Sequence, residues 1–137
     1  MNNRLKKYIY KGYKFIMVGF CSTIFNFSVF VFFYKLCVVH YIASSILGYL
    51  AGLLLGYFIN KNWTFSTQVD KSKSYIRGYV VVYLTSLVAS QTLLYTYVEL
   101  LLINPLYANV IAIGLSTLMN FIGTNYFVFK KHWKFMN

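Results

Sequence analysis

Acidic residues are nearly absent from this sequence, which has 2 Asp and Glu against 13 Lys and Arg in 137 residues. Charged residues make up 11% of the chain, less than half the share of about 25% in soluble domains. A small soluble protein needs many polar groups to cover its surface, whereas 59% of these residues are hydrophobic. The composition therefore excludes a soluble enzyme and a disordered chain, and it leaves a polytopic membrane protein.

Residues that bind metals or carry out catalysis are also scarce. Cys21 lies within an apolar stretch, about 24 Å along a helix from Cys37, so a disulfide between them is not expected. His40 and His132 are expected on opposite sides of the membrane, which gives no metal site. The chain also lacks a glycine-rich phosphate loop or Walker motif. We therefore expect no catalytic residue and no cofactor, and a protein that is not an enzyme.

The net charge of +11 would suit nucleic acid if the basic residues formed one soluble face. They instead form three clusters separated by long stretches without Lys, Arg, Asp or Glu, and only Lys35 lies apart. This pattern is typical of membrane topology, and it favours anionic lipid headgroups over nucleic acid as the partner. The clusters are Arg4 to Lys14, Lys61 to Arg77 and Lys130 to Lys134.

Four apolar windows are long enough to cross a bilayer as helices, since about 20 residues are needed. Asn104-Pro105 offers a start for the last one, because proline is favoured in the first turn of a helix. The sequence therefore predicts an all-α membrane protein, a single domain over 1–137. Its expected spans are 15–36, 41–61, 76–98 and 105–129.

Four spans place both termini and the 61–77 loop on one side, together with every Lys and Arg except Lys35. The positive-inside rule then predicts that this side is the cytoplasm, with 1–14 and 130–137 as cytoplasmic tails. The opposite loops, 36–40 and 99–104, are short. Whatever the protein does is therefore expected to happen in or at the bilayer.

The second half of the chain repeats the first at an offset of 64 residues. At this offset, residues 60–65 (NKNWTF) align with residues 124–129 (TNYFVF). Two stripes of small or polar residues, each stepping by four, also align. They are Ser44, Gly48, Gly52, Gly56 and Asn60 in the first half, and Ala108, Ala112, Ser116, Asn120 and Thr124 in the second. The repeat predicts two tandem helical hairpins that enter the membrane from the same side.

Gly48, Gly52 and Gly56 form a doubled GxxxG motif. Small residues at this spacing let helix backbones approach closely in lipid. We expect this stripe to pack helices, either between the two hairpins or across a homo-oligomer.

Several amide side chains fall within or at the ends of the spans, where an unpaired amide costs several kcal/mol. We expect them to pair with one another or to contact a polar substrate. A buried carboxylate for cation transport is lacking, because Glu99 is expected at the far interface. The amides are Asn26, Asn60, Gln91, Asn120 and Asn125.

These features together resemble the GtrA-like family of small four-helix membrane proteins over residues 10–131. The resemblance rests on KFIMVG at 14–19 with Thr23, NKNWTF at 60–65, YIR at 75–77, and residues 120–129. In one departure, the second copy has Thr124-Asn125 where the family pattern has Asn followed by a basic residue.

The resemblance implies a flippase for undecaprenyl-phosphate-linked monosaccharide in the bacterial plasma membrane. Such a protein would act beside membrane glycosyltransferases in glycosylation of teichoic acid or O-antigen. The implied phosphate-binding residues are Lys61, Arg77 and Lys14, with the amides on sugar or phosphate, and Trp63, Phe65 and Phe129 as interfacial aromatic residues.

Two other functions remain open from the sequence. One is a non-transporting adaptor that anchors or orients a polyprenyl-phosphate glycosyltransferase. The other is a small drug exporter, which would be expected to carry an acidic residue in its first span; residues 15–34 contain none.

Overall fold

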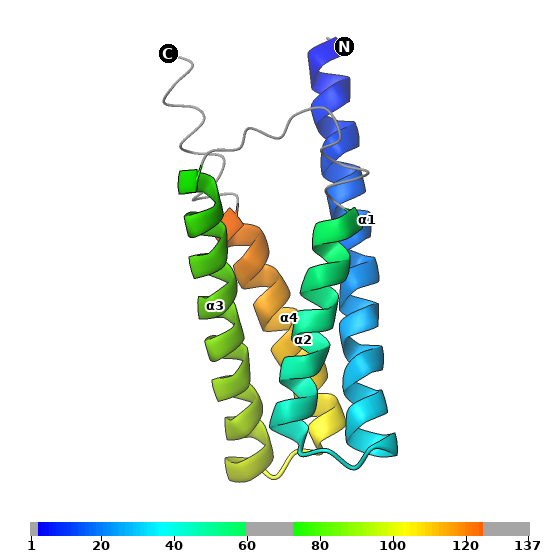
Figure 1. Cartoon of the computed structure of the whole chain (residues 1–137), viewed down its shortest axis with the longest axis vertical. Coiled ribbons are helices and arrows are strands. Elements are labelled where there is room, and N and C mark those ends of the chain that lie inside the picture. The colour runs from blue at the N-terminus through cyan, green and yellow to red at the C-terminus, as the bar shows by residue number, and fades with distance from the viewer. Residues whose placement is uncertain (1–2, 60–72, 125–137) are drawn as a thin grey trace.

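The computed structural model in Figure 1 shows four long helices and no strand among the residues it describes, 3–59 and 73–124. They are α1 (Asn3–Val31), α2 (Tyr41–Ile59), α3 (Lys73–Tyr95) and α4 (Pro105–Thr124), and π-helical turns η1 (Phe32–Leu36) and η3 (Thr96–Leu100) extend the first and third. Each contains a stretch long and apolar enough to cross a membrane: Ile16–Leu36, Tyr41–Ile59, Val80–Leu100 and Pro105–Gly123. The predicted all-α fold with four spanning helices is confirmed.

The third helix runs further than the sequence predicted. We expected it to end at 98, with Glu99 in the following loop. Instead η3 continues to Leu100, because the Leu101 N–H donates to the Thr96 carbonyl at 3.2 Å and adds a wider last turn. Glu99 therefore belongs to the helix end. The predicted ends of the second and fourth spans, 60–61 and 125–129, lie outside the described residues.

Matching caps begin the second helix of each hairpin. Asn104 Oδ1 accepts a hydrogen bond from the Leu106 N–H at 2.9 Å, with Pro105 as the first helical residue between them. Sixty-four residues earlier, His40 Nδ1 accepts from the Ile42 N–H at 3.3 Å. A side-chain acceptor at this position satisfies an N–H group that the helix leaves unpaired. The predicted start of the fourth span at Asn104-Pro105 is confirmed.

The turns inside the two hairpins have the same backbone geometry. Val38 and Leu102, 64 residues apart, adopt left-handed φ values of 54° and 53°. This conformation costs a residue with a Cβ atom about 1–2 kcal/mol, yet both hairpins adopt it. In each, the next residue donates to a carbonyl six residues back, as Val39 does to Phe33 at 3.0 Å. The repeat therefore extends to individual backbone bonds.

The helices are arranged as two antiparallel hairpins. α1 packs mainly against α2, and α3 mainly against α4, with thinner contacts from α1 to α4 and from α2 to α3. The starts of α1 and α3 and the ends of α2 and α4 lie at one end of the bundle, and both short turns lie at the other (Figure 1). We call these the termini end and the turn end. The two hairpins run in the same direction, so the predicted parallel repeat is confirmed.

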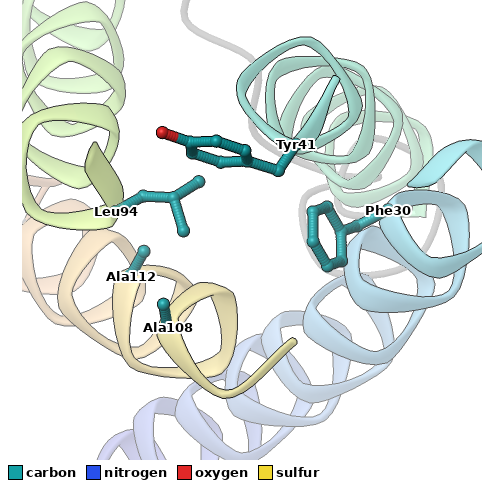
Figure 2. Close-up of a cluster of buried hydrophobic side chains, with 5 residues drawn as sticks. All are labelled: Phe30, Tyr41, Leu94, Ala108 and Ala112. Carbon is teal, nitrogen blue, oxygen red and sulfur yellow. The ribbon is translucent and has the colours of Figure 1, made fainter. Parts of the chain in front are cut away.

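A small apolar core joins the two hairpins near the turn end. Phe30 from α1, Tyr41 from α2, Leu94 from α3, and Ala108 and Ala112 from α4 converge there (Figure 2). Phe30 and Leu94 occupy equivalent positions of the repeat, and both are fully buried. Close packing of such side chains stabilises helix association in lipid through van der Waals contacts, and the core joins the turn ends of all four helices.

Large apolar side chains cover the outside of the bundle. They are exposed along all four spanning helices and include Ile24, Leu54, Leu84 and Ile122. Such a surface suits contact with lipid tails rather than water. Cys21 and Cys37 are both free and exposed.

The glycine stripe packs within the first hairpin. A Cβ atom at Gly48 would lie 2.6 Å from the Asn26 carbonyl oxygen, and one at Gly52 would lie 2.8 Å from the Ser22 carbonyl oxygen. At Gly56 the nearest atom is the Ser22 hydroxyl, at 2.9 Å. The expected position between the hairpins is therefore wrong. The glycines allow the backbones of α1 and α2 to approach, and the sequence did not identify α1 as their partner.

Candidate functional site

A row of polar side chains crosses from one hairpin to the other between α2, α3 and α4. In its part near the turn end, the Ser45 hydroxyl of α2 donates to Asn109 Oδ1 of α4 at 2.8 Å. The Gln91 Nε2 group of α3 donates to the same hydroxyl at 3.1 Å. Ser45 and Asn109 are equivalent residues of the repeat, so this hydrogen bond crosses the axis that relates the hairpins. We call the whole set the polar row; its members are Ser45, Tyr49, Gln91, Asn109 and Asn120.

The polar row continues toward the termini end. The Tyr49 hydroxyl of α2 donates to the Tyr83 backbone carbonyl of α3 at 2.9 Å. Asn120 Nδ2 of α4 lies 3.4 Å from the Tyr49 hydroxyl oxygen, close to the limit of a hydrogen bond. Asn109 and Asn120 are about 17 Å apart along α4, at 1.5 Å per residue. The polar row therefore extends over more than half the thickness of a bilayer core.

Five polar atoms buried in the bundle have no hydrogen-bond partner within the described part of the chain. An amide without a partner in an apolar environment destabilises the protein, typically by several kcal/mol in lipid. Native proteins satisfy most such atoms, so each of these atoms is a candidate partner for a polar ligand or for water. The atoms are Ser22 Oγ, Asn26 Oδ1, Gln91 Oε1, Asn109 Nδ2 and Asn120 Oδ1.

The polar row includes two of the amides that the sequence singled out, Gln91 and Asn120. Asn26 is also buried, with 7% of its surface exposed, but it lies against Gly48 and Gly52 inside the first hairpin. The expected pairing of Asn120 with Asn60 or Asn125 lies outside the described residues. Within them, the polar group near Asn120 Nδ2 is the Tyr49 hydroxyl.

Two of the predicted phosphate-binding residues lie toward the termini end, and the third lies outside the described residues. Lys14 stands on α1 before the apolar span that starts at Ile16, with its ammonium 4.6 Å from the centroid of the Tyr10 ring. Arg77 lies near the start of α3, and its side chain is not among those described. Lys61 and the predicted headgroup or interfacial residues Asn60, Asn125, Trp63, Phe65 and Phe129 lie outside the described residues.

The α1–α4 side of the bundle is less polar than the polar row. There the Thr23 and Thr117 hydroxyl oxygens lie 3.5 Å apart, and Thr23 already donates to the Gly19 carbonyl at 2.9 Å. A hydroxyl that bonds its own helix is satisfied without a partner from another element. The hydrogen-bonding capacity between the hairpins is therefore concentrated on the α2–α3 side.

Sequence reasoning missed Ser45, Tyr49 and Asn109. Like Asn26 and Asn120, Asn109 is an amide inside an apolar span. It directly follows Ala108 in the sequence and is not a member of the small-residue stripe. Its repeat equivalent Ser45 is also polar, and a comparison of the two halves at this position would have found the pair. Tyr49 offered no signal among 14 tyrosines.

A hydrogen bond also joins the hairpins at the turn end, beyond the polar row. The Tyr41 hydroxyl of α2 donates to Glu99 Oε1 at the end of α3, at 2.6 Å. This length is typical of a hydroxyl that donates to a charged carboxylate. Glu99 is exposed and Tyr41 is buried. The hydrogen bond therefore joins α2 to the end of α3 at the surface of the bundle.

Comparisons with known proteins agree with the fold. Residues 14–129 match the family model described as "GtrA/DPMS, transmembrane domain". The chain is 32% identical over 119 residues to "Uncharacterized membrane protein YngA" of Bacillus subtilis (strain 168). That match covers 85% of this chain and 77% of the relative. No solved structure matches the chain.

Proposed function

Because the chain belongs to the GtrA/DPMS transmembrane-domain family, we propose that it flips an undecaprenyl-phosphate-linked monosaccharide across the bacterial plasma membrane. Family membership supports the coarser statement, that this multi-pass membrane protein takes part in handling polyprenyl-phosphate sugars. The direction, the lipid and the use of the sugar on a surface polymer such as teichoic acid or O-antigen belong to the proposal.

The observation that carries the proposal is the polar row between two hairpins whose exterior is apolar. A sugar headgroup carries several hydroxyls, and each one that enters hydrocarbon without a partner costs several kcal/mol. Amides and hydroxyls placed along the bundle lower this cost by replacing water as hydrogen-bond partners. The polyprenyl tail remains against the exposed apolar side chains outside.

The phosphate requires a different kind of partner, because it carries a charge that amides alone stabilise poorly. We assign it to Lys61, Arg77 and Lys14. Of these, Lys14 and Arg77 lie toward the termini end, which we place in the cytoplasm. Arg offers a planar pair of donors, and a long Lys side chain extends to the interface.

The proposed movement needs no chemical step, and the protein acts without catalysing a reaction. Neither a nucleotide-binding motif nor a carboxylate deep in a span is present in the sequence to couple transport to ATP or to ions. Transfer then runs down the gradient of lipid-linked sugar. One membrane glycosyltransferase makes that lipid on the cytoplasmic side, and another consumes it outside.

Deletion of the gene in its host separates this function from that of an adaptor. Loss of a flippase lowers glycosylation of the surface polymer, while the cellular pool of lipid-linked sugar stays constant or rises. Loss of an adaptor for the glycosyltransferase that loads the lipid lowers both. Lipid extraction with mass spectrometry measures the pool, and a fall in the pool to the level of a strain without that glycosyltransferase would contradict the proposal.

A further inference from the structure

We infer that Gln91, Ser45 and Asn109 form a binding site for sugar hydroxyls near the turn end, which distinguishes glycosylated polyprenyl phosphate from the bare lipid phosphate. This inference rests on the proposed function and assigns a role to one part of the polar row. Ser45 and Asn109 are the fifth residues of their helices, about 6 Å in from the turn end. The site therefore lies toward the opposite end of the bundle from Lys14 and Arg77, two of the residues assigned to phosphate.

The unpaired atoms at this site specify the chemistry of its ligand. Gln91 Oε1 is an acceptor and Asn109 Nδ2 is a donor, and both are buried without a partner. The Ser45 hydroxyl links the other ends of the same two amides. A ligand that both donates and accepts is required to satisfy the pair, and a hydroxyl group does both. A phosphate oxygen would accept from Asn109 but leave Gln91 Oε1 unpaired.

The repeat shows that the site is one-sided. Ser45 and Asn109 exchange places across the repeat axis, but the residue equivalent to Gln91 in the first hairpin is Phe27. The Phe27 ring lies 6.1 Å from the ring of Phe30 and packs against the apolar core. The Gln91 amide therefore has no polar counterpart at the equivalent position of α1, which carries an aromatic ring. Within residues 3–59 and 73–124, the site therefore lies on the α2–α3 side of the bundle and has no counterpart on the α1 side.

The Tyr41–Glu99 hydrogen bond lies beyond this site at the turn end and joins the same two helices, α2 and α3. A headgroup bound at Gln91 is consequently held behind a contact that must separate before the sugar leaves. The arrangement places hydroxyl recognition late in the proposed path, after the phosphate has left the basic side chains.

Lipid binding to the purified full-length chain tests the site without requiring transport. Native mass spectrometry compares a polyprenyl-phosphate hexose with polyprenyl phosphate of the same chain length. We expect the parent protein to prefer the hexose lipid. Gln91→Met, which keeps the side-chain length, should lower affinity for the hexose lipid about tenfold, the effect of one or two lost hydrogen bonds, and leave the bare lipid unchanged. The control Thr92→Val changes an exposed neighbour on α3 and should alter neither affinity.

Asn109→Leu, nearly isosteric, provides a second variant and should show the same selective loss. Helical circular dichroism and gel filtration confirm that each variant is folded. Equal affinity of the parent for the two lipids, or equal losses for both lipids in the folded variants, would mean that a buried water alone fills the site and would overturn the inference. A parent that prefers the hexose lipid but does not move it between leaflets would keep the site and contradict the proposed function.

Discussion

The close approach of α1 and α2 predicts that Gly48 tolerates no side chain, even one methyl group. In Gly48→Ala the new Cβ would lie 2.6 Å from the Asn26 carbonyl oxygen, 2.7 Å from Asn26 Oδ1 and 3.3 Å from the Phe30 nitrogen. The closest of these atoms belongs to the backbone, so the helices must move apart. Overpacking of this kind costs about 1–3 kcal/mol.

Gly114→Ala is the matched control, because a Cβ there meets nothing within 4 Å. Both substitutions gain about the same helix propensity, up to about 1 kcal/mol, and this gain cancels in the comparison. The free energy of unfolding of Gly48→Ala should therefore be about 1–3 kcal/mol lower than that of Gly114→Ala. SDS titration of the purified protein in mixed micelles measures it. Equal unfolding free energies would refute the close approach of α1 and α2.

Three further predictions concern topology, the turn end and phosphate binding. In a background without native cysteines, Lys71→Cys should resist a membrane-impermeant thiol reagent in intact cells; labelling from outside would reverse the orientation. Tyr41→Phe removes the hydrogen bond to Glu99 and should lower the free energy of unfolding in SDS by about 1 kcal/mol; an unchanged value would show that the bond adds nothing. Lys61→Gln should reduce surface-polymer glycosylation at normal protein level. Arg77→Lys keeps the charge and removes the planar pair of donors, so it should reduce glycosylation only if the geometry of that pair matters. Normal glycosylation in Lys61→Gln would remove that residue from the phosphate site.

Much of the fold follows from the sequence because lipid imposes simple rules on length and charge. The gaps between basic clusters predicted four spans, and Asn104-Pro105 predicted the start of the fourth. The offset of 64 residues predicted the parallel hairpins, and the matching turns at Val38 and Leu102 follow the same offset.

The partner of each helix face was harder to predict. The Gly48 stripe indicated a close helix approach, but a glycine carries no information on which helix approaches it. The structure assigns that helix as α1. The end of α3 was placed two residues early, because the sequence did not indicate the wider hydrogen bonding of η3.

The candidate site was predicted in part, from amides in apolar surroundings. Gln91 and Asn120 belong to the polar row, whereas Asn26 lies against the glycines inside one hairpin. Ser45 and Asn109 meet at the axis between the hairpins. Their proximity depends on how the hairpins dock, a relation between residues far apart in the chain that helical periodicity does not contain.

The central claim is that this chain itself moves lipid-linked sugar between leaflets, and purified protein in liposomes tests it most directly. Liposomes loaded with labelled polyprenyl-phosphate hexose are treated from outside with an impermeant reagent that destroys the exposed headgroup. Without protein, about half of the label should be protected, because it lies in the inner leaflet. With the parent protein, we predict that nearly all the label becomes accessible, at a rate that falls in Gln91→Met and not in Thr92→Val. Protection that stays at the level of protein-free liposomes, with the protein folded and the lipid bound, would contradict the account.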